Sequence, residues 1–215
     1  HHCENCLSNH PSACEDFNTL NFGGRRGDGT TPYRLGDQDL SLFFGQSSFS
    51  QYVVTRASNA VVVDPEVALT LLGPLGCGIQ TGSGTVLNRL KPVVGESLVV
   101  FGCGAVGLSA IMAAKLTGCS QIIAVDIHAS RLALAGELGA THQINGKEQD
   151  AVAVIKQITG KGAHYAVETT GVSAIVLQAV HAVKPLGTVA IVGFTGDITL
   201  NVQNDLMAEG KSLVG

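Results

Sequence analysis

Charged residues are scarce in this sequence: Asp, Glu, Lys and Arg make up 14% of its 215 residues, against 45% hydrophobic residues. This balance excludes an intrinsically disordered chain or a coiled coil and predicts a globular protein with a substantial core. The 13 Lys and Arg residues are scattered and the formal net charge is -4, so no basic face is available to neutralise a phosphate backbone. We therefore do not expect nucleic acid as a partner.

Long apolar runs are also missing. Gly or polar residues interrupt every candidate, such as residues 99–114, before it reaches the roughly 20 apolar residues of a membrane helix. The sequence does not start with a basic segment followed by an apolar one, as a secretory signal would. Its six cysteines lack the dense, even framework of a small secreted scaffold. The sequence thus predicts a cytoplasmic protein without membrane contacts, whose cysteines are reduced thiols or metal ligands.

The composition divides the sequence into two parts. Residues 1 to about 40 are rich in Gly, Asp, Arg, Asn and Cys, which is typical of loops. Short apolar runs at 52–54 and 60–63 predict strands. Further along, the patterns predict strands at 97–101, 122–125, 165–167 and 188–192, and helices at 105–116, from Ser130 to near Gly139, at 151–158 and at 173–183. This alternation predicts an α/β fold with a doubly wound parallel sheet.

The motif Gly102-Cys103-Gly104-Ala105-Val106-Gly107 directly follows one expected strand and opens the next helix. In this G-x-G-x-x-G pattern the first glycine permits a tight turn, the second lets a pyrophosphate approach the backbone, and the third lets helix and strand pack closely. Asp126 follows about 20 residues later, where a carboxylate can accept hydrogen bonds from both ribose hydroxyls and repel a 2′-phosphate. The spacing favours NAD over NADP; the alternatives are simple turn glycines and a solvated Asp126. Arg131 either contacts the ribose or is a solvated helix residue.

Three cysteines near the start have the spacing of a zinc knuckle. Cys3 and Cys6 share one turn, and Cys14 follows after seven residues. A short pair of thiolates closed by a third from a loop is typical of tetrahedral zinc, and a metal would hold a polar loop that has little core of its own. The fourth ligand could be a histidine (His1, His2 or His10) or a cysteine preceding the first residue. The alternative is a set of free thiols.

The other three cysteines have no such spacing. Cys77 lies between two glycines, and taken alone it would be a buried structural cysteine. Cys103 and Cys119 are interpreted as small apolar residues.

In combination, these motifs closely resemble the zinc-dependent medium-chain alcohol dehydrogenases. The stretches that carry the resemblance are Cys3-Glu4-Asn5-Cys6 with Cys14, Phe49-Ser50-Gln51-Tyr52, Gly76-Cys77-Gly78 with Thr81-Gly82, Gly102 to Gly107 with Asp126, Glu168-Thr169-Thr170-Gly171, and Ile191-Val192-Gly193. The aryl-alcohol (benzyl-alcohol) branch is the most similar part of the family. The resemblance spans essentially the whole sequence.

The resemblance implies a domain organisation. Residues 1–78 would be the last part of a β-rich, GroES-like catalytic domain with the structural-zinc loop, and residues 79–215 a Rossmann domain that binds NAD. It also implies an internal fragment, because the family's first structural-zinc cysteine, its other catalytic-zinc ligands and its proton-relay hydroxyl would precede His1, and its chains continue past Gly215. Residues 212–214 would form the strand of a homodimer or homotetramer.

The resemblance further implies roles for single residues. Cys77 would bind the catalytic zinc, and Cys3, Cys6 and Cys14 the structural one. Thr81 and Val106 would pack on the nicotinamide, while the backbone at Val192 and Phe194 would bind its carboxamide. Phe43, Phe44 and Phe194 would be walls of the substrate pocket, unless they are core residues.

The function implied is reversible oxidation of a primary, aromatic or allylic alcohol to its aldehyde with NAD. In the family, zinc stabilises the alkoxide and the hydride passes to C4 of the nicotinamide. The 215 residues alone are expected to be inactive. Two alternatives stay open: a zinc-free quinone reductase that uses NADPH, against which Cys77 and Asp126 count, and a noncatalytic dinucleotide-binding module.

Overall fold

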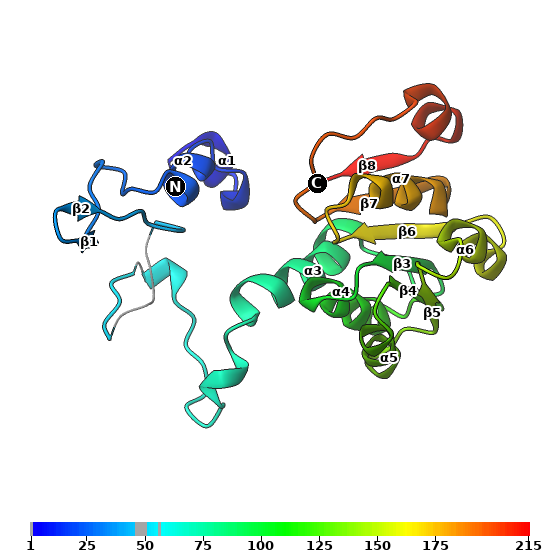
Figure 1. Cartoon of the computed structure of the whole chain (residues 1–215), viewed down its shortest axis with the longest axis horizontal. Coiled ribbons are helices and arrows are strands. Elements are labelled where there is room, and N and C mark those ends of the chain that lie inside the picture. Colours follow the sequence, from blue (N-terminus) through cyan, green and yellow to red (C-terminus); the bar gives the residue numbers. More distant parts are fainter. Residues whose placement is uncertain (1, 46–50, 56) are drawn as a thin grey trace. The chain divides into compact units, whose positions relative to one another are not determined.

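The computed structural model describes residues 2–45, 51–55 and 57–215 (Figure 1). The chain divides into two compact units, His1–Pro65 and Glu66–Gly215, which we call the N-terminal unit and the sheet unit. The predicted domain boundary after residue 78, and the assignment of residues 1–78 to a catalytic domain, stay predictions.

Six parallel strands form the sheet of the sheet unit, in the order β5-β4-β3-β6-β7-β8. Their bounds are β3 Ser97–Phe101, β4 Gln121–Asp126, β5 His142–Asn145, β6 Ala163–Glu168, β7 Val183–Ile191 and β8 Ser212–Val214. In chain order this is the 3-2-1-4-5-6 arrangement of a Rossmann fold, whose order reverses between β3 and β6. The predicted doubly wound sheet is confirmed, and its switch point is where a dinucleotide site is expected.

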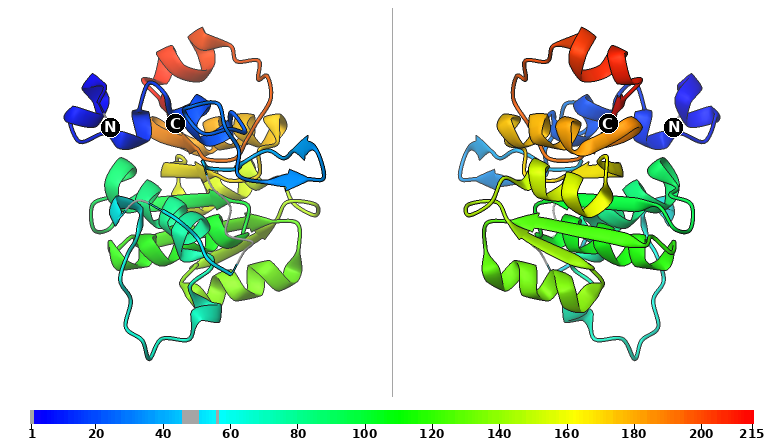
Figure 2. Two further views of the ribbon diagram at one scale, coloured as in Figure 1. Left: turned by 90° about the vertical axis from the view of Figure 1, so that its left-hand side faces the viewer. Right: turned by 90° about the vertical axis from the view of Figure 1, so that its right-hand side faces the viewer.

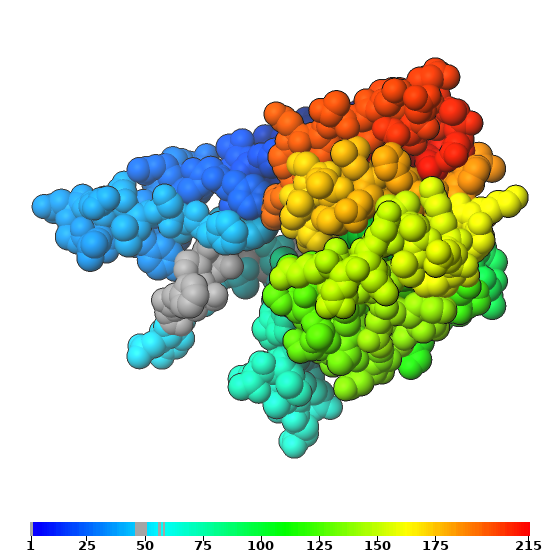
Figure 3. All heavy atoms as spheres, turned by 45° about the vertical axis from the view of Figure 1, so that its right-hand side comes forward, coloured from blue at the N-terminus to red at the C-terminus, as the bar shows by residue number. Residues whose placement is uncertain are grey.

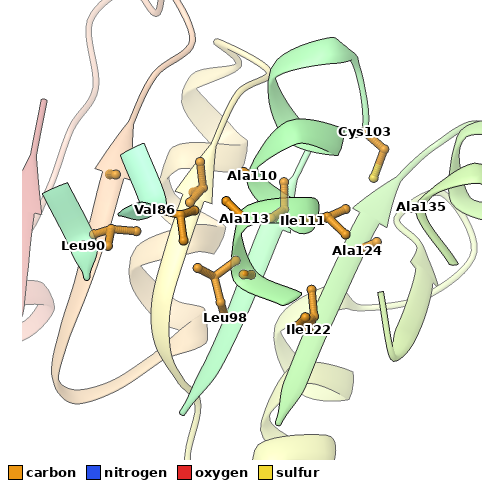
Figure 4. Packing of buried hydrophobic residues seen from close by; sticks show 14 of the residues in the cluster. Val86, Leu90, Leu98, Cys103, Ala110, Ile111, Ala113, Ile122, Ala124 and Ala135 are labelled. Atoms are coloured by element: carbon orange, nitrogen blue, oxygen red, sulfur yellow. The ribbon is translucent and has the colours of Figure 1, made fainter. Parts of the chain in front are cut away.

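The sheet is covered on both faces, which explains its continuous apolar strands (Figure 2). Leu98 and Val100 of β3 face α4, α5 and η5, and Figure 4 shows Leu98 packed with Ala113 and Ile111 of α4. Val99 and Phe101 point to the other face, where α6 and α7 pack. In the space-filling view, the green, yellow and gold segments of the sheet unit form one continuous surface on the face shown (Figure 3).

Helices α4 to α7 of the sheet unit lie where the sequence patterns predicted helices, and the other helical elements of this unit were not predicted. All its helical elements are η3 Leu69–Leu71, η4 Leu75–Ile79, α3 Gln80–Gly84, η5 Thr85–Leu90, α4 Ala105–Leu116, α5 Ala129–Leu138, α6 Ala151–Thr159, α7 Ser173–Ala182, η6 Val202–Leu206 and η7 Met207–Glu209. Among the residues the structure describes, no helix is long and apolar enough to cross a membrane.

Three parts of the sheet unit differ from the predictions. Helix α5 was expected to start at Ser130 but begins one residue earlier, at Ala129, with His128 as its N-cap. The short strand β5 was not predicted, since its sequence His-Gln-Ile-Asn is mostly polar. A continuous helical segment over residues 75–90 was not predicted either. Its four glycines disfavour a helix by intrinsic propensity, so contacts elsewhere in the fold must stabilise it.

The N-terminal unit has little regular structure, as its composition predicts. It contains α1 Glu4–Leu7, η1 Pro11–Ala13, α2 Phe17–Phe22, η2 Ala57–Asn59 and a two-stranded antiparallel ribbon of β1 Arg34–Leu35 and β2 Gln38–Asp39. The strands predicted at 52–54 and 60–63 are wrong: these residues are irregular and exposed. Apolar β-branched residues form a strand only where a neighbouring strand pairs with them, and no described strand lies against these runs.

Candidate functional site

The glycine loop lies at the carboxyl end of β3 and opens α4. Gly102 has φ +91°, and a Cβ there would lie 2.6 Å from Thr169 Oγ1. A Cβ on Gly107 would overlap the carbonyl oxygen of Gly102. Gly104, at the N-terminal cap of α4, differs because a Cβ there would meet nothing within 4 Å. The first and third glycines are thus required by the fold, whereas the second leaves space over the helix N-terminus, where an anion binds favourably.

Asp126 ends β4 beside this loop and is 7% exposed. Its Oδ2 accepts the N–H of Cys103 (2.7 Å), and its Oδ1 accepts those of Ile127 (2.7 Å) and His128 (2.9 Å). Burial would raise the pKa of this carboxyl, but these hydrogen bonds and the charge of Arg131 outweigh it and hold the pKa below its usual range. The carboxylate is therefore charged at neutral pH. Oδ2 accepts only one of these bonds, which leaves it capacity for a ligand hydroxyl.

Arg131 lies one turn into α5, with Nη1 at 3.8 Å from Asp126 Oδ2. Its side chain is about half exposed. Arg131 therefore lies beside the carboxylate of Asp126 and is only partly solvated. Its contact with the ribose stays a prediction.

Two residues at the end of β6 support the loop, and sequence reasoning assigned them no role. Thr169 Oγ1 lies 2.9 Å from the carbonyl oxygen of Phe101 and 3.0 Å from that of Gly102, and donates to them. Glu168 is fully buried, and its carboxylate accepts the N–H groups of Thr170 (2.6 Å) and Gly171 (3.2 Å) and the Thr170 hydroxyl. These bonds fix the ends of β3 and β6 at the switch point.

The end of β7 is fixed to the same edge. The carbonyl oxygen of Glu168 accepts the N–H groups of Val192 (2.8 Å) and Gly193 (3.1 Å). A Cβ on Gly171 would overlap the Phe194 carbonyl, so the two loops touch through their backbones. The Phe194 side chain is 99% exposed. The structure therefore brings the predicted residues Val192 and Phe194 to the carboxyl edge that carries the glycine loop.

Cys77 is exposed and lies in the π-helical turn η4, which continues into α3. The expectation for Cys77 taken alone, a buried structural cysteine, does not hold. The turn rests on the start of α4, because a Cβ on Gly78 would lie 3.4 Å from Ala105 Cβ and 4.0 Å from Val106 Cγ2. Thr81 follows within α3. Cys77 is thus next to the helix whose N-terminus carries the glycine loop.

The three cysteines of the N-terminal unit meet in space. Cys3 precedes α1, Cys6 lies within it and Cys14 follows η1, and their sulfur atoms lie within 4.8 Å of one another. Backbone hydrogen bonds from Glu15 and Cys6 lower the pKa of Cys3 to about 7, whereas burial and the neighbouring thiols raise that of Cys6 to about 11. Three thiols this close fit a thiolate-binding cation such as zinc. In the described part of the chain this is the one such group, and His2 and His10 do not belong to it.

The remaining cysteines behave as small apolar residues. Cys103 is buried in the core, and burial together with the Asp126 charge raises the pKa of its thiol to about 12. Burial likewise raises the pKa of the half-buried Cys119. These thiols are poor metal ligands because they stay protonated.

Phe43 and Phe44 pack edge to face, with ring centroids 4.6 Å apart, and both contact Phe22. Both are more exposed than core residues. Phe44, with Phe17 and Tyr52, lines a pocket of about 910 Å³ within the N-terminal unit. Phe194 belongs to the sheet unit. Of the motif at residues 49–52, Phe49 and Ser50 lie outside the described residues.

Comparison with known proteins identifies the family. The model of the family described as "Zinc-binding dehydrogenase" matches residues 105–215, more than half of the chain. The chain belongs to the zinc-binding dehydrogenase family. The family resemblance expected from the motifs is thereby confirmed.

Relatives of this zinc-binding dehydrogenase include a geraniol dehydrogenase of Castellaniella defragrans, 46% identical over 89% of this chain and 52% of the relative. Among solved structures, an alcohol dehydrogenase zinc-binding domain protein from Burkholderia ambifaria is 47% identical with a TM-score of 0.92. A benzyl alcohol dehydrogenase from Acinetobacter calcoaceticus is 46% identical with a TM-score of 0.89. Each match covers 100% of this chain and 59% of the solved chain. The chain therefore spans between half and two thirds of the length of these relatives.

Proposed function

We propose that this chain is the NAD-binding part of a zinc-dependent alcohol dehydrogenase that oxidises a primary, aromatic or allylic alcohol reversibly to its aldehyde. The observation that carries the proposal is the placement of η4, the turn that contains Cys77, against the helix that opens with the glycine loop. A candidate metal ligand and a candidate dinucleotide site are thus both positioned by helix α4.

The cofactor site is supported by the geometry around Gly104 and Asp126. The open space at Gly104 and the free N–H groups of the first turn of α4 suit a pyrophosphate. The charged carboxylate of Asp126 suits a ribose hydroxyl and disfavours a 2′-phosphate. The space at Gly104 suits either dinucleotide, and the Asp126 carboxylate favours NAD over NADP.

Two zinc sites are proposed. Cys3, Cys6 and Cys14 would hold a structural ion, for which three converging thiols are a suitable donor set. Cys77 would supply one thiolate to a catalytic ion, with its exposed position in η4 as support. When bound, zinc would supply a Lewis acid for deprotonation of the alcohol, and NAD would supply the hydride acceptor.

The residues of this chain would place the reactants. The glycine loop would bind the pyrophosphate, Asp126 the ribose, and the backbone at Val192 and Phe194 the carboxamide. Thr81 and Val106 would pack on the nicotinamide face away from the substrate. Placement of this kind contributes to rate because the two reacting carbons must be held at about 3–3.5 Å.

The substrate class is supported by two observations. Phe43 and Phe44 form an apolar aromatic surface in the N-terminal unit, and Phe194 is an exposed aromatic residue of the sheet unit. Relatives at 46% identity bear the names geraniol dehydrogenase and benzyl alcohol dehydrogenase. We therefore propose an allylic or benzylic primary alcohol as substrate.

The test uses the complete product of the reading frame that contains this sequence. We expect NADH to form when NAD and benzyl alcohol or geraniol are added, and the purified protein to contain zinc. Replacing Cys77 by Ser should abolish turnover and remove one zinc ion, while NAD binding persists. Cys119→Ser is the matched control, since this thiol lies away from both cysteine motifs.

Either of two outcomes would contradict the proposal. If metal-free protein kept its full activity and preferred NADPH, the protein would be a zinc-free reductase. If the protein bound NAD but oxidised no alcohol, it would be a noncatalytic dinucleotide-binding module.

A further inference from the structure

Helix α3 approaches α4 so closely that Gly82 has no room for a side chain. A Cβ on Gly82 would overlap the carbonyl oxygen of Val106 and the hydroxyl of Ser109. Gly84, in the same helix, differs because its Cβ would meet only Asn88 Nδ2, at 3.7 Å. The close approach is therefore specific to the side of α3 that carries Gly82.

Ser109 lies at the same contact and is 2% exposed. Its hydroxyl lies 2.8 Å from the carbonyl oxygen of Val106, in its own helix, and 3.2 Å from that of Gly78. The bond to Gly78 crosses from α4 to the turn that carries Cys77. Loss of this donor would leave the part-buried carbonyl of Gly78 with one hydrogen bond fewer, so this bond favours one position of the turn.

The same turn contacts the start of α4 through Gly78, which packs on Ala105 and Val106. Three contacts, at Gly78, Gly82 and Ser109, thus hold residues 77–82 against the helix that opens with the glycine loop. None of them involves a residue with a proposed role in binding metal, and all lie within the sheet unit.

We infer that Gly82 and Ser109 are positioning residues, which fix Cys77 relative to the glycine loop and hence the catalytic metal relative to the nicotinamide. This inference rests on the proposed function. Hydride transfer is sensitive to such placement, because a displacement of about 1 Å can lower a rate about 100-fold. Binding of NAD is far less sensitive, because the glycine loop, Asp126 and the end of β7, which would hold most of the cofactor, lie outside residues 77–82.

The first test compares Ser109→Ala with Ser83→Ala in the complete protein. Ser83 is a matched control because its hydroxyl bonds to Ile79, within its own helical segment, at 2.7 Å. For Ser109→Ala we expect kcat with benzyl alcohol to fall about tenfold and the primary deuterium isotope effect to increase. Its zinc content and its Kd for NAD should stay near those of wild type, as should all properties of Ser83→Ala. Equal kcat values in the two variants would contradict the inference.

The second test measures hydrogen exchange and does not require an active enzyme. Hydrogen exchange of the amides at residues 75–82 should be about threefold faster or more in Ser109→Ala than in Ser83→Ala, because the turn has lost its cross-helix bond. Gly82→Ala should show the same effect relative to Gly84→Ala, whose added methyl group makes only an ordinary van der Waals contact with Asn88 Nδ2. Unchanged exchange would overturn the inference even if the wild type oxidises alcohols. An inactive wild type with faster exchange in Ser109→Ala would instead overturn the proposed function and leave the contact between turn and loop established.

Discussion

Asp126 accepts the backbone N–H of Cys103 across 2.7 Å, which joins the end of β4 to the glycine loop after β3. The same carboxylate accepts two further N–H groups, from Ile127 and His128. The carboxylate therefore has two roles. It fixes the loop at the switch point of the sheet, and it presents a negative charge where the ribose of a dinucleotide would lie. Variants of Asp126 should affect both.

Replacing Asp126 by Asn should weaken NAD binding and relax the exclusion of NADP. The amide keeps one acceptor oxygen but places an NH₂ group near an N–H donor and loses the charge. We expect the Kd for NAD to rise about tenfold or more, as for loss of a hydrogen bond to a charged group, and NADP to bind detectably. Calorimetric titration with both dinucleotides measures this change.

Asp150→Asn is the control for general loss of charge. Asp150 caps α6 by accepting the N–H of Ala153 at 3.1 Å, and Asn caps a helix about as well. Its affinity for both dinucleotides should match that of wild type. Unchanged cofactor preference in Asp126→Asn would show that the carboxylate does not contact the ribose.

Replacing Cys14 by Ser should remove one zinc ion per chain and destabilise the N-terminal unit alone. With two thiols left, the donor set is too small for a closed tetrahedral site, and the short elements around it have little core to replace the metal. Metal analysis should give about one zinc ion fewer than wild type. Hydrogen exchange should become faster in residues 2–45 and stay unchanged in β3 to β7. If Cys14→Ser kept the zinc content of wild type, Cys3, Cys6 and Cys14 would be free thiols and not metal ligands.

His164 should make the sheet unit less stable in mild acid. Its Nδ1 accepts the N–H of Ser97 at 3.1 Å, which requires a neutral ring. Burial and the charge of Lys184 lower the pKa of His164 below 6.5, against the opposing effect of Glu96. Because the unfolded chain then binds more protons than the folded one, this contribution to the free energy of unfolding is complete above about pH 6.5 and is lost as the pH falls below that value.

Denaturant unfolding at about pH 7.5 and about pH 5.5 measures this effect. Gln at position 164 can accept the Ser97 N–H without titrating, so His164→Gln should lose less stability between the two pH values than wild type. His142→Gln, on the edge strand β5, should keep the pH dependence of wild type. If His164→Gln lost as much stability between the two pH values as wild type does, a group other than His164 would cause the pH dependence.

Most of the sheet could be predicted because strands covered on both faces leave continuous apolar runs, as in residues 97–101. Strand β5 lies at the edge and buries only Ile144, so it leaves no such signal. The runs at 52–54 and 60–63 carry the signal without forming strands, because a strand also requires a partner, which the sequence pattern does not reveal.

The glycine loop and Asp126 could be predicted because their roles depend on local spacing. The supporting residues could not. Thr169 bonds to Phe101, 68 residues away, and Ser109 to Gly78, 31 residues away. A hydroxyl at either position has no distinguishing sequence pattern, and its partner becomes known only when the strands and helices are placed.

The second and third glycines of the loop should separate NAD binding from folding. At Gly104 an added methyl group meets no protein atom within 4 Å, so Gly104→Ala should fold with the Tm of wild type. The methyl group would instead occupy the space proposed for the pyrophosphate, and we expect the Kd for NAD to rise about tenfold. At Gly107 the methyl group would overlap the carbonyl of Gly102, so Gly107→Ala should lower the Tm by several degrees or prevent folding.

Gly196→Ala is the matched control, since a Cβ there also meets nothing within 4 Å but lies outside the glycine loop. It should keep both the Tm and the NAD affinity of wild type. The decisive comparison is Gly104→Ala against this control, because the two substitutions are equally free of clashes in the folded chain. If Gly104→Ala binds NAD as well as Gly196→Ala does, the space over the N-terminus of α4 is not where the pyrophosphate lies, whatever the effect at Gly107.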